Sequence, residues 1–397
     1  MQVLISNPDK VQRTLIHELK ITEKLLSKVA TDLSGTEKRA EVYAMPDLGI
    51  PPYAYRLCGG FPTGMFAHWE TDIPFIPVDT TMNVCGVGIY RINGYIPIME
   101  FKIRVEKALK DSKYKWNYAK GNHMISLMEA NGAQCLQKGQ YLVLHASANE
   151  FQQDNKEKGL FVMPDNWFYD KIKTVYDIHS DRYLRYIVGK DAVKFYSTAK
   201  CLEKYNYDRN DYLAKKILGE NYDKRVVASK HYGMPTINSV AIGCHWACRL
   251  YPLLTAPGKN IYLVYPDFNN AFSIDGGKKI CLSPHGFGVD TDADIKINGA
   301  SVEIGEKEFS SDDFENYSIN IGEDVEIREA ENVRKKVNAI LESCPGEIID
   351  SLRQLAAFTK AGFEVYDWDA KKGGKPPFLR FKRKNFRDKE YSLLEFT

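Results

Sequence analysis

The stretch VDTTMNVCGVGIYR, residues 78–91, has the texture that decides the fold of the first third of the chain. From residue 44 to about residue 99, a region that includes this stretch, Gly and Pro recur among short apolar runs such as FIPVD and GVGIYRI. Short apolar runs bounded by these residues are typical of strands joined by tight turns. We therefore expect a sheet here. Cys85 lies before one of its strands, next to a glycine that allows close backbone approach.

Helical periodicity is found on both sides of this region. Residues 11–33 have apolar side chains at helical spacing, and residues 181–218 carry a second helical pattern rich in Tyr, Leu and Lys. Residues 333–358 also read as a helix, interrupted near Pro345. Further strands are expected at 141–144, 239–242, 261–265 and 279–282, with a hairpin at 295–304 that turns at NGA. This order predicts one α+β domain with helical insertions.

The composition is that of a globular protein with a modest charge. Hydrophobic residues make up 44% of the 397 residues, which is enough for a large core without covalent staples. The formal net charge is only +2, so bulk charge does not hold this protein to nucleic acid. Any contact with RNA must therefore come from a local groove.

The cysteines and the N-terminal sequence indicate a reducing compartment. Eight cysteines occur in a long chain, without the density of a small disulfide scaffold. The first residues, MQVLISNPDK, lack the apolar core of a signal peptide. No apolar run approaches the about 18 residues of a membrane-spanning helix. We expect reduced thiols and a cytoplasmic protein.

Four of the eight histidines share a local setting. Each stands in a Gly-rich turn or at the end of an apolar run, in GNHM (His123), YLVLHAS (His145), SKHYG (His231) and CLSPHGFG (His285). A strand that opens into a turn places its side chain at the rim of a sheet, where sites are commonly built. Imidazoles and a thiolate together suit borderline divalent metals. Each histidine alone can equally be structural, and Cys244 and Cys248 have no second pair at zinc-ribbon spacing.

Taken in order, these motifs resemble the RtcB family of GTP-dependent RNA ligases. MPD at 45–47, with the following GGFPTGMFA, is similar to the family's MPD motif and glycine turn, and residues 78–91 resemble G-V-G-Y/F-D-I-N-C-G-V-R. The later matches are GNH at 121–123, the strand into His145, His231 in SKHYG, residues 244–258, SPHGFG at 283–288 and PPFLRFKR near the C-terminus. The resemblance spans residues 44–383, most of the chain. It implies a single RtcB-like catalytic domain over 1–397, with an N-terminal helical segment (1–40), a peripheral helical insertion (181–220) and a variable C-terminal region (290–375).

The resemblance also implies an activity. His285 would be the nucleophile that takes GMP from GTP, and Asp47 would orient it. One or two Mn²⁺ ions would be bound by Cys85, His123, His145 and His231, with Asp79 as a fifth ligand. Nucleotide contacts would come from Asn122, Ser283, Asn270 and Lys382. The reaction would join RNA ends bearing a 2′,3′-cyclic phosphate or a 3′-phosphate to 5′-hydroxyl ends, with a possible activating protein partner.

The sequence departs from the family pattern at several positions. Met82 replaces the metal-binding aspartate in an ungapped alignment, Val289 replaces an arginine, and residues 266–270 (PDFNN) replace the family's G-S-M-G-T loop. These differences leave two alternatives open. One is a metal-dependent phosphoesterase or nucleotidyltransferase on the same fold, and the other is an inactive RNA-binding relative.

Overall fold

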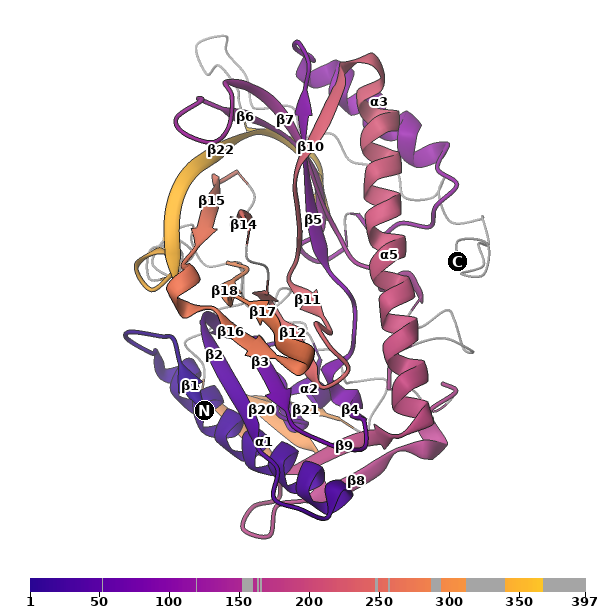
Figure 1. The fold of residues 1–397 in the computed structure, drawn as a ribbon. Helices are drawn as coiled ribbons and strands as arrows, with labels where there is room; N and C mark the ends of the chain where they lie inside the picture. Colours follow the sequence, from indigo (N-terminus) through magenta and orange to yellow (C-terminus); the bar gives the residue numbers. More distant parts are fainter. Residues whose placement is uncertain are drawn as a thin grey trace.

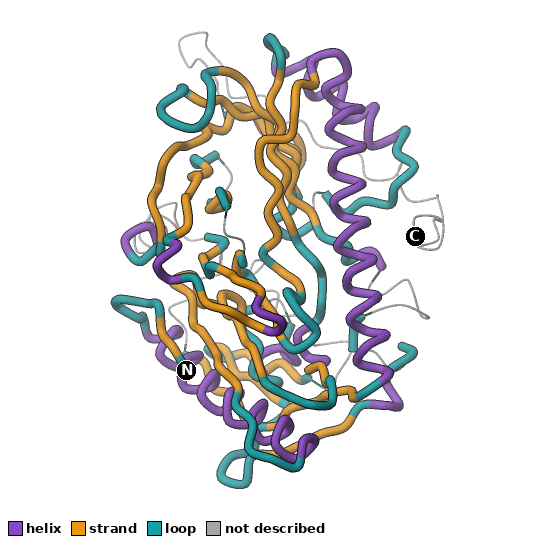
Figure 2. The backbone as a smooth tube through the Cα atoms, in the orientation of Figure 1, coloured by secondary structure: helices purple, strands orange, loops and turns teal. Residues whose placement is uncertain are grey.

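A computed structural model describes residues 1–51, 53–118, 120–151, 160–162, 164, 166–246, 249–255, 258–286, 294–311 and 340–366. Lys382, Val289 and the C-terminal motif PPFLRFKR lie outside these residues. Within them the fold is mixed α+β, with strands in mostly antiparallel sheets and long helices on the outside (Figures 1 and 2). The fold class is therefore confirmed at this level.

The larger sheet has eight strands and curls into a half-barrel. Its order is β10-β5-β7-β6-β22-β15-β14, with β23 paired to β22, and all its pairings are antiparallel. Figure 1 shows β22 arching from β6 over to β15. The strands are β5 (Gly86–Ile92), β6 (Met124–Ala130), β7 (Gly139–Ala146), β10 (Tyr222–Lys230), β14 (Tyr251–Leu253), β15 (Ile261–Pro266), β22 (Gly346–Thr359) and β23 (Gly362–Val365).

A five-stranded sheet lies below it in Figure 1, together with smaller sheets. Its order is β1 (Gln2–Val3), β2 (Ala40–Gly49), β3 (Thr63–Trp69), β12 (Ser239–Ile242) and β11 (Tyr232–Gly233). The smaller sheets are formed by β4 (Phe75–Pro77), β9 (Tyr183–Val188) and β8 (Lys173–Tyr176); by β19 (Ile295–Asn298), β20 (Ser301–Ile304) and β21 (Lys307–Ser310); by β13 (Cys244–His245) and β18 (Ser283–Pro284); and by β16 (Phe272–Ile274) and β17 (Lys278–Ile280).

Helices pack against the sheets, and the first helix is anchored to β2 by hydrogen bonds. α1 (Lys10–Ser34) starts at a capping box between Asp9 and Gln12. The Gln12 amide also donates to the carbonyls of Pro46 and Leu48, which anchors α1 to the strand that carries Asp47. The other helices are α2 (Ala54–Cys58), α3 (Ile98–Lys110) and α5 (Lys190–Leu218), with short 3₁₀ turns η1 (Val78–Thr80), η2 (Tyr169–Lys171), η3 (Gly219–Asn221), η4 (Phe268–Asn270) and η5 (Asp275–Gly277). Among the described helices, none has the length and apolarity to cross a lipid bilayer.

Two expectations from the sequence are wrong. Residues 183–188 form β9, and the helix begins only at Lys190, because Gly189 turns the chain with a φ of 63°. Of the helix predicted over 333–358, residues 333–339 lie outside the described residues and residues 340–342 are helical, but residues 346–359 form the strand β22. This strand lies between β6 and β15 and is buried on both faces in its second half, so its apolar run LAAF lacks the alternation that marks a half-exposed strand.

The proposed subdivision of the chain also changes. α5 lies on the outside, as a peripheral insertion would, but it runs along the molecule and packs against β5, β7 and β10 (Figure 1). The region 290–375 contains β22, an interior strand of the larger sheet. In contrast, the helix at 11–33 and the hairpin at 295–304 are confirmed, and the expected strands at 141–144, 239–242, 261–265 and 279–282 lie within or overlap β7, β12, β15 and β17.

Candidate metal centre

Four of the predicted residues meet at one end of the larger sheet. Cys85 directly precedes β5, His123 directly precedes β6, His145 lies near the end of β7, and His231 directly follows β10. These strands are neighbours, and their register places Val87 and Met124 opposite His145. Side chains that are far apart in the sequence therefore converge at adjacent strand ends, as the local setting of the histidines predicts.

Three of these side chains form a compact group of donor atoms. The Cys85 Sγ lies 3.0 Å from the His145 Nε2 and 3.5 Å from the His123 Nε2. All three donor atoms lie within 4.8 Å of one another, and all three residues are buried. A cysteine and two histidines at this spacing can hold a metal ion. His231 adjoins them, with its Nε2 3.2 Å from the Nε2 of His145.

Backbone carbonyls set the tautomers of two of the rings. The His123 Nδ1 faces the Asn117 carbonyl at 3.3 Å, and the His145 Nδ1 faces the Asn122 carbonyl at 3.1 Å. A carbonyl only accepts, so each Nδ1 carries the proton and donates it. Each Nε2 therefore carries a lone pair, which is directed at the Cys85 sulfur. A ring that donates one N–H to a carbonyl and presents the other nitrogen is the arrangement of metal-bound histidines.

Burial keeps these groups neutral when no cation is bound. It lowers the pKa of His123 to about 3 and lowers the pKa values of His145 and His231 well below their usual range. Burial raises the pKa of the Cys85 thiol, and the charge of Arg209 opposes this rise. The imidazoles are thus ready to bind a cation, whereas the thiol must release a proton on binding. The Nδ1 of His231 is buried and has no hydrogen-bond partner among the described residues, an orphaned polar atom beside a donor set that suits a borderline divalent cation.

A carboxylate–histidine pair lies beside this group. The Asp47 Oδ2 accepts the backbone N–H of His285 at 3.0 Å, that of Gly286 at 2.9 Å, and the ring Nδ1–H of His285. Asp47 is completely buried. The His285 ring centroid is 5.3 Å from that of His231. The Nδ1 of His285 donates to the carboxylate, and no hydrogen bond within the described residues occupies the Nε2.

Gly286 makes this pair possible. Its φ is +107°, and a Cβ at this position would lie 2.2 Å from the carbonyl oxygen of Leu254. No other residue fits without a backbone shift. The glycine after His285 thus lets the chain fold back so that two successive N–H groups reach the same oxygen of Asp47.

Asp79, predicted as a fifth ligand, does not belong to the metal group. Its carboxylate is buried in an ion pair with Arg185, whose Nε lies 3.0 and 3.1 Å from the two oxygens. Met82, the residue aligned with the family's aspartate, is packed in the apolar core. Among the described residues, the group therefore contains no carboxylate.

The structure describes three of the four residues that were predicted to contact the nucleotide. Asn122 is exposed, and its carbonyl orients His145. Ser283 is buried in β18, opposite His245. Asn270 ends η4, and Lys382 is outside the described residues.

His245, by contrast, is a structural histidine. Its Nδ1 lies 2.6 Å from the Ser229 Oγ and its Nε2 lies 3.1 Å from the Pro252 carbonyl, so both ring nitrogens are satisfied. The sequence reading did not identify Asn117, Asn206 and Arg209, which hold the ligands from behind. The one signal available was that Asn206 and Arg209 lie at helical spacing between Leu202 and Leu213, on the face that these leucines mark as buried.

A scan against models of known protein families finds no match to this chain. A search of curated proteins likewise finds no significantly similar sequence.

Proposed function

We propose that this protein is a metal-dependent RNA ligase that works through a histidine–GMP intermediate, as the RtcB resemblance implies. The observation that carries the proposal is the arrangement of His285. Its ring is held by a buried carboxylate, no hydrogen bond among the described residues occupies its Nε2, and it adjoins a Cys/His group suited to a divalent cation. A neutral imidazole oriented in this way is an activated nucleophile for phosphoryl transfer.

In the first step, the His285 Nε2 attacks the α-phosphorus of GTP. An N–P bond forms, the bond to the bridging oxygen breaks, and pyrophosphate leaves. The ring becomes positively charged as the N–P bond forms, and Asp47 stabilises this charge through the Nδ1–H. The two backbone N–H groups on the same oxygen keep the carboxylate in place, so the ring does not rotate.

In the second step, an oxygen of the RNA 3′-phosphate takes GMP from His285, which restores the free imidazole. The 5′-hydroxyl of the other RNA end then attacks the activated phosphorus, GMP leaves, and the hydroxyl proton passes to water. A 2′,3′-cyclic end must first be opened by water to a 3′-phosphate. Burial of His285, which is 4% exposed, limits hydrolysis of the phosphoramidate.

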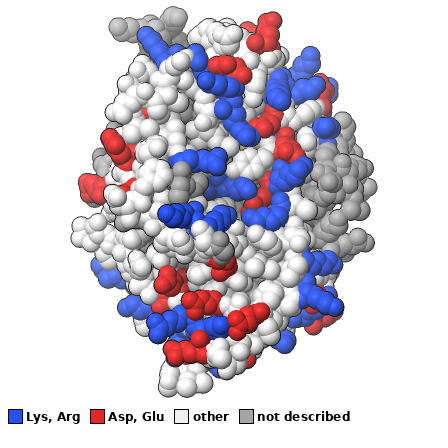
Figure 3. All heavy atoms as spheres, viewed as in Figure 1, with Lys and Arg blue, Asp and Glu red and all other residues white. Residues whose placement is uncertain are grey.

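Cys85, His123 and His145 would hold one Mn²⁺ ion, and His231 would bind from the side of His285, either this ion or a second one. When bound, the cation supplies charge neutralisation for the phosphate oxygens. RNA would lie on a local basic surface. Lys and Arg side chains gather across the middle of the face shown in Figure 3, with acidic side chains below them, although the net charge of the chain is small.

Incubation with α-³²P-GTP and Mn²⁺ tests this proposal. We expect an acid-labile covalent label on the wild-type chain, no label from γ-³²P-GTP, and loss of the α-label in His285→Ala. His68→Ala is the control, because His68 lies on β3 and pairs with Asp275 outside this group. Ligation of RNA ends that bear a 2′,3′-cyclic phosphate and a 5′-hydroxyl then tests the substrate.

The same assay separates the alternatives. Bound metal without covalent label contradicts a histidine–GMP intermediate and supports metal-dependent phosphoester hydrolysis or transfer to another acceptor. Absence of both label and metal contradicts any catalytic role and leaves an RNA-binding protein.

A further inference from the structure

We propose that Asn206 and Arg209 on α5 are positioning residues that set the geometry of Cys85, His145 and His123 from behind. The inference rests on the proposed metal centre. It concerns residues that do not touch the cation or the substrate.

Asn206 joins the backbone next to two of the ligands. Its Nδ2 donates to the Val84 carbonyl at 3.0 Å and to the Ala146 carbonyl at 2.9 Å. Val84 precedes Cys85, and Ala146 follows His145. The pairing of β5 with β7 ends at Gly86 and Ala146, so the amide bridges the two chains just where the strand ladder stops. One side chain thereby fixes the separation of the two backbones that carry the sulfur and the His145 ring.

The segment before Cys85 needs such an anchor. Thr81 and Val84 have positive φ angles of 48° and 51°, a conformation that β-branched residues rarely adopt. Strained backbone persists only where surrounding contacts hold it, and it is concentrated at functional sites. The Asn206 amide holds the Val84 carbonyl, and the Tyr232 hydroxyl holds that of Thr80. The strain therefore marks a segment that is fixed to aim Cys85.

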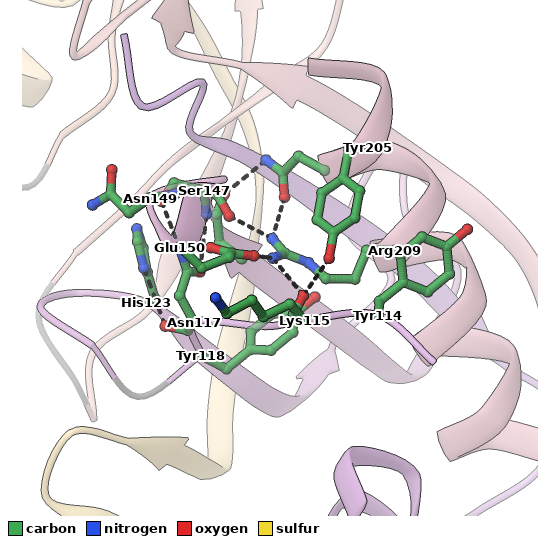
Figure 4. A network of polar contacts seen from close by, with 12 residues as sticks. Tyr114, Lys115, Asn117, Tyr118, His123, Ser147, Asn149, Glu150, Tyr205 and Arg209 are labelled. Atoms are coloured by element: carbon green, nitrogen blue, oxygen red, sulfur yellow. Dashed lines mark hydrogen bonds and ion pairs between the residues drawn. The ribbon is translucent and has the colours of Figure 1, made fainter. Parts of the chain in front are cut away.

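Arg209 extends the same support to His123. It is fully buried and donates to the Ser147 carbonyl at 2.7 Å and to the Asn206 Oδ1 at 2.6 Å, in addition to its ion pair with Glu150 (Figure 4). Ser147 in turn exchanges hydrogen bonds with the Asn117 side chain, at 2.7 and 3.2 Å. The Asn117 carbonyl accepts the Nδ1–H of His123. A continuous set of hydrogen bonds thus runs from one face of α5 to the backbone beside Cys85 and His145 and to the ring of His123.

Matched substitutions on α5 test the inference. Asn206→Leu removes the bridge, and Asn206→Asp keeps the acceptor for Arg209 but turns an oxygen toward two carbonyls. Asn210→Leu is the control, since Asn210 is also a buried asparagine of α5 but bonds to the Tyr118 hydroxyl. The readout is Co²⁺ affinity, measured by the thiolate-to-cobalt charge-transfer absorption, with thermal unfolding measured in parallel.

We expect both Asn206 variants to bind Co²⁺ about 10- to 100-fold more weakly than the wild type, with a shifted absorption band. The Asn210→Leu variant should keep wild-type Co²⁺ affinity, even if its melting temperature falls as much as that of the Asn206 variants. Equal Co²⁺ affinity in the wild type and the Asn206 variants would overturn the inference.

A crystal structure of metal-free Asn206→Asp separates the two proposals. If the wild type binds no Co²⁺, the proposed metal centre is wrong. The crystal structure of the variant still shows whether Asn206 positions Cys85 and His145. We expect the Cys85 Sγ and His145 Nε2 to move apart from their 3.0 Å contact. An unchanged separation would show that α5 does not set it.

Discussion

The metal-free protein should lose stability steeply as the pH falls below neutrality. Burial lowers the pKa of His123 and His245 to about 3, and lowers the pKa values of His145 and His231 well below their usual range. In the unfolded chain the same four rings titrate near 6.5. The folded state therefore binds fewer protons. Its stability is fully present above the unfolded pKa and is lost as the pH falls from about 6.5 toward about 3.

The size of this loss follows from linkage. When the pH falls from 7.5 to 5.5, each of these histidines takes up a proton in the unfolded chain but stays neutral in the folded chain. Each one therefore reduces the free energy of unfolding by about 1.4 kcal/mol. The four together give about 5.5 kcal/mol, which is comparable to the whole stability of many domains. Glu150 acts in the opposite direction, because burial raises the pKa of its carboxyl group.

Urea unfolding of EDTA-treated protein at pH 7.5, 6.5 and 5.5 measures the effect. His245→Gln should reduce the drop by about 1.4 kcal/mol, since this ring is buried but is not a candidate ligand. A change of less than about 1.4 kcal/mol between pH 7.5 and 5.5, the share of a single histidine, would refute the reasoning that all four rings are buried and neutral.

Three substitutions test the site itself. Cys85→Ser should weaken Co²⁺ binding at least about 100-fold and abolish the charge-transfer band, whereas the exposed Cys201→Ser should not, as titrated spectrophotometrically. Asp47→Asn should slow the formation of the GMP label by about 10²-fold or more, because the amide cannot stabilise the charged ring; a wild-type rate in quenched-flow labelling would contradict this. Arg209→Met should destabilise the fold by about 3–5 kcal/mol because it leaves the Glu150 charge buried and unpaired, and Arg209→Met with Glu150→Gln should recover part of this loss in urea unfolding.

The sequence predicted the local elements whose pattern is independent of their neighbours. α1 has a clean apolar stripe and a capping box, and the hairpin of β19 and β20 has its turn residues. β22 was misread because a strand buried on both faces loses its alternation, and that burial comes from β6 and β15, which lie far away in the sequence. The periodicity of a short segment contains no information about strands that are distant in the sequence and pack beside it.

The candidate site was predictable to a similar extent. Residue type and strand-end position drew attention to the histidines, and the family resemblance supplied the ligand set that includes Cys85, His123 and His145, which the structure brings together. The structure does not bring Asp79 to this group, because a buried carboxylate pairs with the cation that the fold places next to it. Here that cation is Arg185 on β9, a strand that the sequence reading assigned to a helix. The error in the secondary structure and the error in the ligand set therefore have the same origin.

The contrast between His145 and His245 shows what separates a ligand from a structural histidine. Both rings are buried, and both follow or lie in short strands. His245 has a hydroxyl on one nitrogen and a carbonyl on the other, so its hydrogen-bonding capacity is used within the fold. His145 gives its Nδ1 proton to a carbonyl, but its Nε2 faces only a sulfur and another imidazole nitrogen. In the metal-free protein the proton of the Cys85 thiol lies between the sulfur and this nitrogen, and a cation can replace that proton. The second nitrogen's partner, which is set entirely by tertiary structure, therefore distinguishes the two roles.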